Sequence, residues 1–182
     1  MFVDETKVHV RAGDGGAGIT AFQKVRGKPK GKPDGGNGGA GGDVYVTADA
    51  SMATLLEYKR RPHRRAADGS HGRGDLRHGR QGDDLGLPVP VGTVVKDEDG
   101  TVIADLVSAG QRVKLVSGGR GGRGNAAFVS RRHHAPGFSE QGEYGQERWF
   151  TLELKLVADA AIVGFPNVGK STLIAAVSAA RP

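Results

Sequence analysis

The sequence predicts a mainly β protein followed by the opening of an α/β nucleotide-binding fold. Three observations support this class. Glycine supplies 31 of the 182 residues and is concentrated in a few stretches, short alternating apolar segments lie between those stretches, and a glycine-framed phosphate loop follows an apolar run near the end. The length allows one ordinary domain and a piece of a second.

Glycine is concentrated in residues 13–18, 27–42, 69–86 and 118–124. Within these stretches glycine recurs at intervals of three residues, a periodicity that we call the three-residue beat. Three residues make one turn of a polyproline-type helix, which has no internal hydrogen bonds. Its backbone groups must therefore find partners sideways, and glycine lets neighbouring backbones approach closely enough. Flexible linkers are the alternative. The regular beat and the scarcity of serine favour a packed bundle of such helices.

The segments between the glycine stretches have strand character. Residues 43–47 are β-branched and aromatic, residues 93–103 predict a hairpin around an acidic turn, and residues 112–117 and 150–156 alternate apolar with polar side chains. Residues 52–58 allow only a short helical turn. We therefore predict an all-β module over roughly the first 155 residues.

The pattern changes after this module. Residues 156–163 form a mostly apolar run suited to a buried parallel strand, and residues 173–180 predict a helix of Ala, Leu and Ile. Between them lies a full match to the phosphate loop G-x-x-x-x-G-K-[ST], consisting of Gly164, Phe165, Pro166, Asn167, Val168, Gly169, Lys170, Ser171 and Thr172. Strand, tight loop and helix are the context that this motif requires.

The residue types in this loop each have a role in binding phosphate or magnesium. Gly164 and Gly169 permit a turn whose backbone N–H groups point at phosphate oxygens, at the start of a helix. Lys170 would place its ammonium on the β- and γ-phosphates, and the Ser171 hydroxyl would complete the shell of a magnesium ion. Hydrolysis also needs a second, acidic magnesium ligand, a switch segment and a group that positions water. Only ten residues follow Thr172, so we assign no catalytic residue here and expect this chain alone to be inactive.

The net charge of +6 suits a polyanionic partner such as RNA. Two basic clusters are candidate phosphate contacts: one is Lys24, Arg26, Lys28, Lys30 and Lys32, and the other is Lys59, Arg60 and Arg61 with Arg64 and Arg65. Solvated surface is the alternative for both. Aromatic stacking has little support, because only Phe22 and Tyr58 lie near these clusters.

Cysteine is absent, which excludes disulfides and cysteine-based zinc sites and favours a cytoplasmic location. His71, His78, His133 and His134 have no spacing that would make them converge on a metal, so we interpret them as turn or surface residues. The start of the chain is charged where a secretory signal needs an apolar core, and no run approaches the length of a membrane span. We therefore expect no membrane partner.

Several motifs together resemble the Obg family of ribosome-associated bacterial GTPases, and the resemblance extends over essentially the whole chain. They are Met1 to Asp4, Gly13 to Gly16, Gly35 to Gly39, Pro90 to Val95, Gly118 to Asn125, Leu152 to Lys155 and Gly164 to Thr172. The resemblance implies an Obg glycine-rich domain in residues 1–157, built as six polyproline-type helices over a small β-barrel. Residues 158–182 would then begin a Ras-like G domain.

The same resemblance implies GTP and GDP as ligands, bound through Gly164 to Thr172, with magnesium on Ser171 and slow hydrolysis. It also implies binding to the large ribosomal subunit and its RNA during maturation, a link to growth and stress control, sensitivity to guanosine tetraphosphate, and a monomer. Two functional classes are compatible with the chain. The parent protein would be a regulatory GTPase, whereas this chain alone would be a non-catalytic ribosomal-RNA docking module. A generic ATPase would fit the loop but leave the glycine-rich module unexplained.

Overall fold

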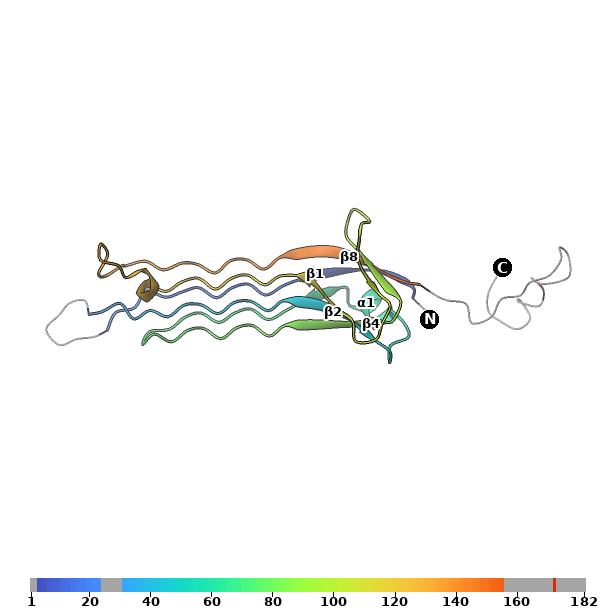
Figure 1. Cartoon of the computed structure of the whole chain (residues 1–182), viewed down its shortest axis with the longest axis horizontal. Coiled ribbons are helices and arrows are strands. Elements are labelled where there is room, and N and C mark those ends of the chain that lie inside the picture. Colours follow the sequence, from blue (N-terminus) through green and yellow to red (C-terminus); the bar gives the residue numbers. More distant parts are fainter. Residues whose placement is uncertain (1–2, 24–30, 156–171, 173–182) are drawn as a thin grey trace.

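The computed structural model describes residues 3–23, 31–155 and 172. Within these residues a β domain carries a bundle of glycine-rich segments that project from it side by side as a long rod (Figure 1). The first and last strands, β1 (Glu5–Arg11) and β8 (Glu147–Leu154), both lie in the β domain. The chain therefore leaves the β domain and returns to it several times.

One sheet of the β domain contains five strands in the order β3-β1-β8-β5-β6. Its other members are β3 (His63–Arg65), β5 (Thr93–Lys96) and β6 (Val102–Leu106). The β1, β8, β5 and β6 neighbours pair antiparallel, whereas β3 runs parallel to β1. Side chains alternate across this sheet: Val8 of β1 and Phe150 of β8 are paired and buried, while their neighbours His9 and Trp149 lie on the outer face.

The second sheet contains three strands, β4 (Leu85–Pro90), β2 (Val44–Asp49) and β7 (Arg112–Val116), in that order. The β2 strand pairs parallel with β4 and antiparallel with β7. Pro88 and Pro90 lie within β4, which is an edge strand. An edge strand tolerates proline because its outward side needs no ladder hydrogen bonds.

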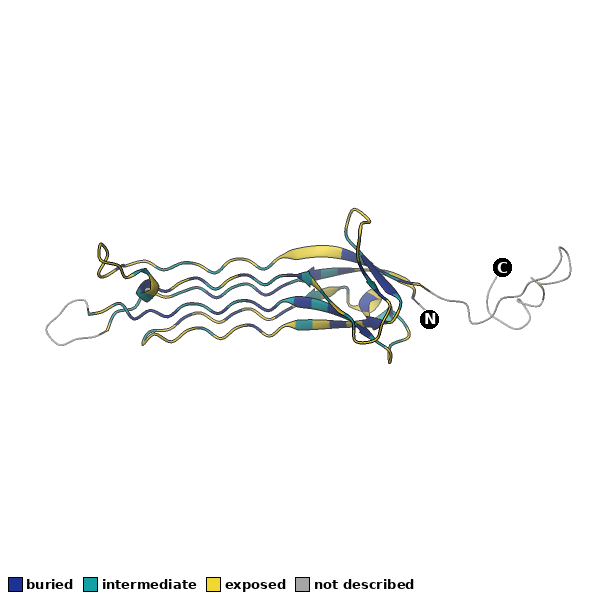
Figure 2. Ribbon diagram, viewed as in Figure 1, coloured by how far each residue is buried: buried dark blue, intermediate teal, exposed yellow. Residues whose placement is uncertain are grey.

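The two sheets share a single hydrophobic core, drawn in dark blue in Figure 2. It combines residues of both sheets, such as Val46 and Leu152, which are fully buried. The short helix α1 (Leu56–Arg60) adds Tyr58, whose hydroxyl donates to the Pro88 carbonyl at 2.5 Å. Burial raises the pKa of Tyr58 above its usual range. The buried Tyr58 thus anchors α1 to the second sheet.

The rod consists of six segments that we call arms, and each continues a strand of the β domain. Arms 1 to 6 are residues 12–22, 33–43, 66–73, 77–84, 117–124 and 138–146. They form three pairs, each joined at the far end from the β domain (Figure 1). The η1 turn (Asn125–Phe128) follows arm 5 at that far end.

Backbone hydrogen bonds join neighbouring arms at every third residue. Arm 1 donates to arm 2 through the N–H groups of Gly13, Gly16 and Ile19, at 2.8 to 3.2 Å, and arm 2 donates to arm 3 through Gly36, Gly39 and Gly42, each at 2.9 Å. Arm 2 also donates to arm 5 from Gly38 and Gly41. Arms 1 and 2 are therefore the centre of the rod, and the other arms surround them.

The glycines of the central arms are required by close backbone approach. A Cβ atom on Gly38 would collide with the carbonyl group of Gly16, and one on Gly41 would collide with the carbonyl group of Gly13. Any side chain at either position would push arms 1 and 2 apart. The three-residue beat of glycine in the sequence thus records which backbone positions face a neighbouring arm.

Some backbone N–H groups of the arms have no partner in the backbone hydrogen bonds between arms, and side chains accept these groups instead. Asp68 Oδ1 accepts the Asp14 N–H at 2.8 Å, His71 Nδ1 accepts the Ala17 N–H at 2.9 Å, and His78 Nδ1 accepts the Asn37 N–H at 3.1 Å. All three acceptors belong to arms 3 and 4 and satisfy donors of arms 1 and 2. The rod therefore satisfies backbone groups that neither a helix nor a sheet ladder serves.

The mainly β class is confirmed, as are the hairpin of β5 and β6 and the strands predicted near residues 43–47, 112–117 and 150–156. The glycine stretches are packed against one another, which rules out the flexible-linker alternative for the described arms. Strands β1, β3 and β4 were not predicted, and the helical turn predicted at 52–58 begins earlier than the helix α1, Leu56–Arg60. The strand predicted at 156–163 and the helix predicted at 173–180 lie outside the described residues.

Candidate functional site

The predicted phosphate loop falls almost entirely outside the described residues. Gly164 to Ser171 are not described, and Thr172 is described as an exposed residue. The assignments of phosphate contacts to this loop and of magnesium to Ser171 therefore remain predictions from the sequence.

The residues of the two predicted basic clusters that the structure describes lie in different parts of the molecule. Lys32 is exposed and directly precedes arm 2, on the side away from β2, and Lys24 to Lys30 lie outside the described residues. Lys59, Arg60 and Arg61 end α1 and are exposed on the β domain. Lys32 and the described residues of the second cluster therefore lie on separate surfaces.

Much of the second cluster is used in structural contacts. The Arg64 guanidinium pairs with Glu57 at 2.6 Å and lies over the Tyr58 ring, while Arg65 pairs with Asp68 at 2.7 Å. Lys59, Arg60 and Arg61 have no ion pair within the described part of the chain. These last three residues remain available to a polyanion.

At the tip, the buried side chain of Asn125 ties three segments together. Its Oδ1 accepts the N–H groups of Gly35 at 2.9 Å and Ala21 at 3.3 Å. Its Nδ2 donates to the carbonyls of Ala21 at 2.9 Å and Pro136 at 3.1 Å. Asn125 uses both its donor and its acceptor groups on backbone atoms. The tip therefore has a defined shape, set by one fully buried amide.

Beyond Asn125, residues 129–137 form a loop at the end of the rod, which is exposed except at Pro136 and is largely yellow in Figure 2. The loop is held at its base by the rings of Phe128 and Phe138, 4.9 Å apart, and Arg123 lies over the Phe128 ring at 4.6 Å. Arg131 and Arg132 project from it as exposed residues. They make no ion pair with any residue that the structure describes.

Charge at the tip is partly neutralised within the rod. Arg123 pairs with Glu140 at 2.7 Å, which holds the pKa of the Glu140 carboxyl below its usual range, and Arg77 pairs with Asp75 at 3.0 Å. Arg73 has no such partner among the described residues. Together with Lys32, Arg131 and Arg132 it gives the far end of the rod a net positive charge. Such a charge suits contacts to nucleic-acid phosphates that do not depend on the base sequence.

The histidines have separate positions. His71 and His78 use Nδ1 as backbone acceptors, as described above, and His133 and His134 are exposed in the tip loop. Within the described residues, no three His, Cys, Asp or Glu side chains come together as a metal site.

Sequence reasoning missed the most informative residues of the tip. Asn125 stands alone at the end of a glycine beat, and no local pattern indicates that it bonds to residues about 100 positions away. Arg131 and Arg132 are adjacent in the sequence and could have been identified as a basic pair. They were overlooked because their position at the tip depends on the pairing of arms 5 and 6.

An interlocked rod of glycine-rich arms on a two-sheet domain, followed by a phosphate-loop sequence, defines an Obg-type protein. A family profile described as GTP1/OBG matches residues 3–156, and one described as 50S ribosome-binding GTPase matches residues 159–182. The chain belongs to the GTP1/OBG family.

Curated relatives agree with this assignment. The chain is 54% identical over 182 residues to the GTPase Obg of Persephonella marina, and over 183 residues it is 56% and 55% identical to those of Moorella thermoacetica and a Sulfurihydrogenibium species. All of this chain is covered in each comparison, but only 54%, 43% and 53% of the relative. The chain thus spans about half the length of the relatives it matches. Among the described residues, no helix is long and apolar enough to cross a membrane.

Proposed function

We propose that this chain is the amino-terminal part of a GTP-binding and GTP-hydrolysing protein that acts in assembly of the large ribosomal subunit and in growth and stress control. The observation that carries the proposal is the match of the whole chain to proteins named GTPase Obg at 54 to 56% identity. A cytoplasmic monomer that binds GTP, GDP and guanosine tetraphosphate, with no membrane partner, fits this proposal.

The nucleotide would be held by Gly164 to Thr172. In this proposal the loop backbone binds phosphate oxygens, Lys170 neutralises the β- and γ-phosphates, and Ser171 holds magnesium. Magnesium would bridge the phosphates and offset their charge during hydrolysis. The chain alone would be inactive, because the switch segment, the acidic magnesium ligand and the water-positioning group are not among its motifs.

We further propose that residues 1–157 form the Obg glycine-rich domain and that residues 158–182 begin the G domain. The two profile matches end and begin on either side of this boundary, which supports it. The arms would be polyproline-type helices, and the two sheets would be the small β-barrel of that fold. The three-residue spacing of the lateral hydrogen bonds supports this assignment, because it equals one turn of such a helix.

For this chain by itself we propose the second function, a non-catalytic module that docks on ribosomal RNA. The described arms satisfy one another's backbone hydrogen-bonding groups, which supports folding of the rod without nucleotide. The rod carries unneutralised cations at its tip, where Lys32, Arg131 and Arg132 are exposed. A narrow cationic rod can enter a cleft between RNA helices and seat on phosphates from several sides.

Substitution of Lys170 tests the nucleotide site in the whole protein. Lys170→Ala should abolish binding of a fluorescent GTP analogue, because the loop loses the charge that meets the phosphates. Arg181→Ala, which removes a cation outside the loop motif, is the matched control and should bind normally. Unchanged GTP affinity in Lys170→Ala would remove the loop from the site.

The docking proposal is tested by replacing cations at the tip. Removing Lys24, Arg26, Lys28, Lys30 and Lys32 together should flatten the dependence of ribosome binding on salt. Each lost phosphate contact lowers the slope of log affinity against log salt by about 1. Arg131→Ala with Arg132→Ala should add to this effect. An unaltered slope in both variants would place the interface elsewhere.

A further inference from the structure

The outer face of the five-stranded sheet carries a row of three rings. His63, His9 and Trp149 are register partners across β3, β1 and β8. The ring centroids of His9 and Trp149 are 4.9 Å apart, and those of His63 and Trp149 are 5.6 Å apart. These contacts hold the indole in place, yet 39% of Trp149 remains exposed. An aromatic ring that is fixed on one side and open on the other is ready to contact a partner.

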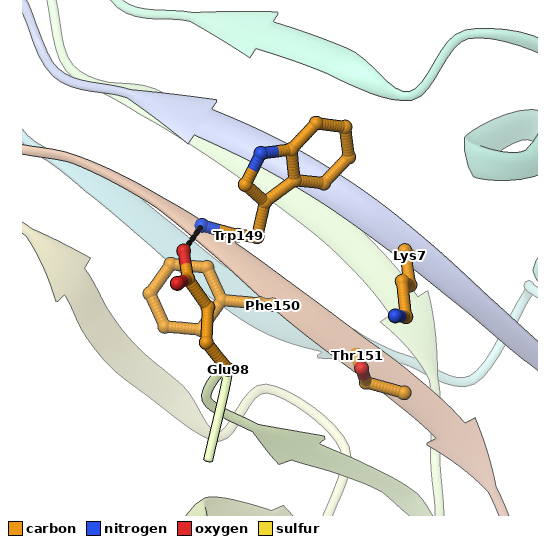
Figure 3. Close-up of a pocket in the computed structure, with 5 residues that line it drawn as sticks. All are labelled: Lys7, Glu98, Trp149, Phe150 and Thr151. Carbon is orange, nitrogen blue, oxygen red and sulfur yellow. Dashed lines mark hydrogen bonds between the residues drawn. The ribbon is translucent and has the colours of Figure 1, made fainter. Parts of the chain in front are cut away.

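A cavity of about 400 Å³ opens beside this ring and is lined by Lys7, Glu98, Trp149, Phe150 and Thr151 (Figure 3). Glu98 comes from the turn between β5 and β6, and its Oε1 accepts the backbone N–H of Trp149 at 3.1 Å. The bond fixes the carboxylate beside the backbone of the residue that carries the indole. The cavity therefore combines an aromatic face with a fixed negative charge.

A second cavity, of about 350 Å³, shares Glu98 and Trp149 with the first. It adds the carboxylates of Asp97, Asp99 and Glu147 and the cation of Arg148. The two cavities are thus lined by four carboxylates and by the cations Lys7 and Arg148, and Glu147 also pairs with Arg11 at 3.7 Å. Four acids against three cations leave a net negative charge on a chain whose total is +6. The sign of the charge here is opposite to that of the chain as a whole.

We propose that this surface docks an arginine or lysine side chain from a basic peptide segment of a partner protein. The cation would lie over the Trp149 indole and pair with Glu98, which combines a cation–π contact with an ion pair. Charge complementarity selects this occupant. Nucleic acid is disfavoured because its phosphates would meet four carboxylates, although the same indole could stack on a base.

The chain contains a single tryptophan, so its fluorescence reports on this cavity directly. The 182-residue chain is titrated with a nine-residue peptide that alternates arginine with glycine, and then with the same peptide carrying glutamine for arginine. Oligouridylate serves as the nucleic-acid probe. We expect the arginine peptide to change the Trp149 emission and the glutamine peptide to leave it unchanged.

Two substitutions define the contacts. Glu98→Gln should weaken binding of the arginine peptide about two- to fivefold, as expected for one exposed ion pair. Trp149→Leu, followed by anisotropy of a labelled peptide, should weaken it by a similar factor. Asp75→Asn removes the same charge at the distant end of arms 3 and 4 and is the matched control. Circular dichroism establishes that all three variants are folded.

Three results would overturn the proposal. One is an emission that does not respond to the arginine peptide up to millimolar concentration. Another is equal affinity of Glu98→Gln and the unaltered chain, which would mean that charge attraction is not local to this cavity. The third is a response to oligouridylate with none to the arginine peptide, which would assign the ring to base stacking.

Discussion

Replacement of Gly38 by alanine should unfold the rod, because the new methyl group has no space. Its Cβ would lie against the Gly16 carbonyl group, so arms 1 and 2 would have to move apart by about 1 Å or more to restore ordinary contact. Such a shift breaks the bond from Gly16 to Gly39 at 2.8 Å. Arms 3 and 5 are bonded to both arm 1 and arm 2, so they cannot follow both, and the bonds from Gly38 to Gly122 at 2.8 Å and from Gly39 to Ser70 at 2.9 Å are disrupted as well. At about 1 kcal/mol each, and more where the groups stay buried, the loss is roughly 3 to 5 kcal/mol. That is a large part of a typical domain stability.

The assay is urea denaturation followed by circular dichroism, with Gly86→Ala as the matched control. Nothing lies within 4 Å of a Cβ on Gly86 in β4, so the control should keep its stability within about 1 kcal/mol. Hydrogen exchange of the arm amides adds a local readout, because the lateral bonds should open in Gly38→Ala first. Equal stability of the two variants, with the arm amides still protected, would refute the packed rod.

Three further predictions concern the tip and the arms. Asn125→Ala should lower the free energy of unfolding, measured by urea denaturation, by about 2 to 4 kcal/mol, because the buried Gly35 N–H and the Pro136 carbonyl lose their partner. A decrease of less than about 0.5 kcal/mol would mean that the Asn125 amide does not hold the tip together. Leu76 has φ 56° and is exposed, so Leu76→Asn should raise stability by about 0.5 to 1 kcal/mol, and a lower melting temperature would contradict the strain. The Asp14 N–H lowers the pKa of Asp68, and Arg123 lowers that of Glu140. A carboxyl whose folded pKa is depressed stabilises the fold fully above its unfolded pKa of about 4 and loses that stability as pH falls through the folded value. The melting temperature should therefore fall when the pH is lowered below about 4. Asp68→Asn should show a smaller fall, and a pH profile identical to that of the unaltered chain would exclude Asp68 as a cause.

The sequence indicated arms 2 and 5 because the requirement for glycine at close backbone contacts is visible in the local sequence. Close backbone approach demands glycine, so the beat in residues 35–42 and 118–124 is visible without a structure. Arm 6 was not predicted because it lies at the outside of the rod. There Glu140, Gln141 and Glu143 can carry side chains, and only Gly142 and Gly145 face another backbone closely.

The β domain was predicted in part for a related reason. In β8 and β7 the apolar face is visible as an alternation, but in β1 the outward Lys7, His9 and Arg11 made the segment look like a charged terminus. The two prolines hid β4, which tolerates them only because it is an edge strand. Long-range contacts such as those of Asn125 leave no trace in the neighbouring sequence.

We propose that the arms form a self-supporting rod that docks on ribosomal RNA. The most direct test measures binding of the 182-residue chain to purified large ribosomal subunits over a salt series, with no nucleotide present. We predict binding whose logarithm falls linearly with the logarithm of salt concentration, as expected when cations displace counterions from RNA phosphates. No binding at low salt, or binding that salt does not weaken, would contradict the claim.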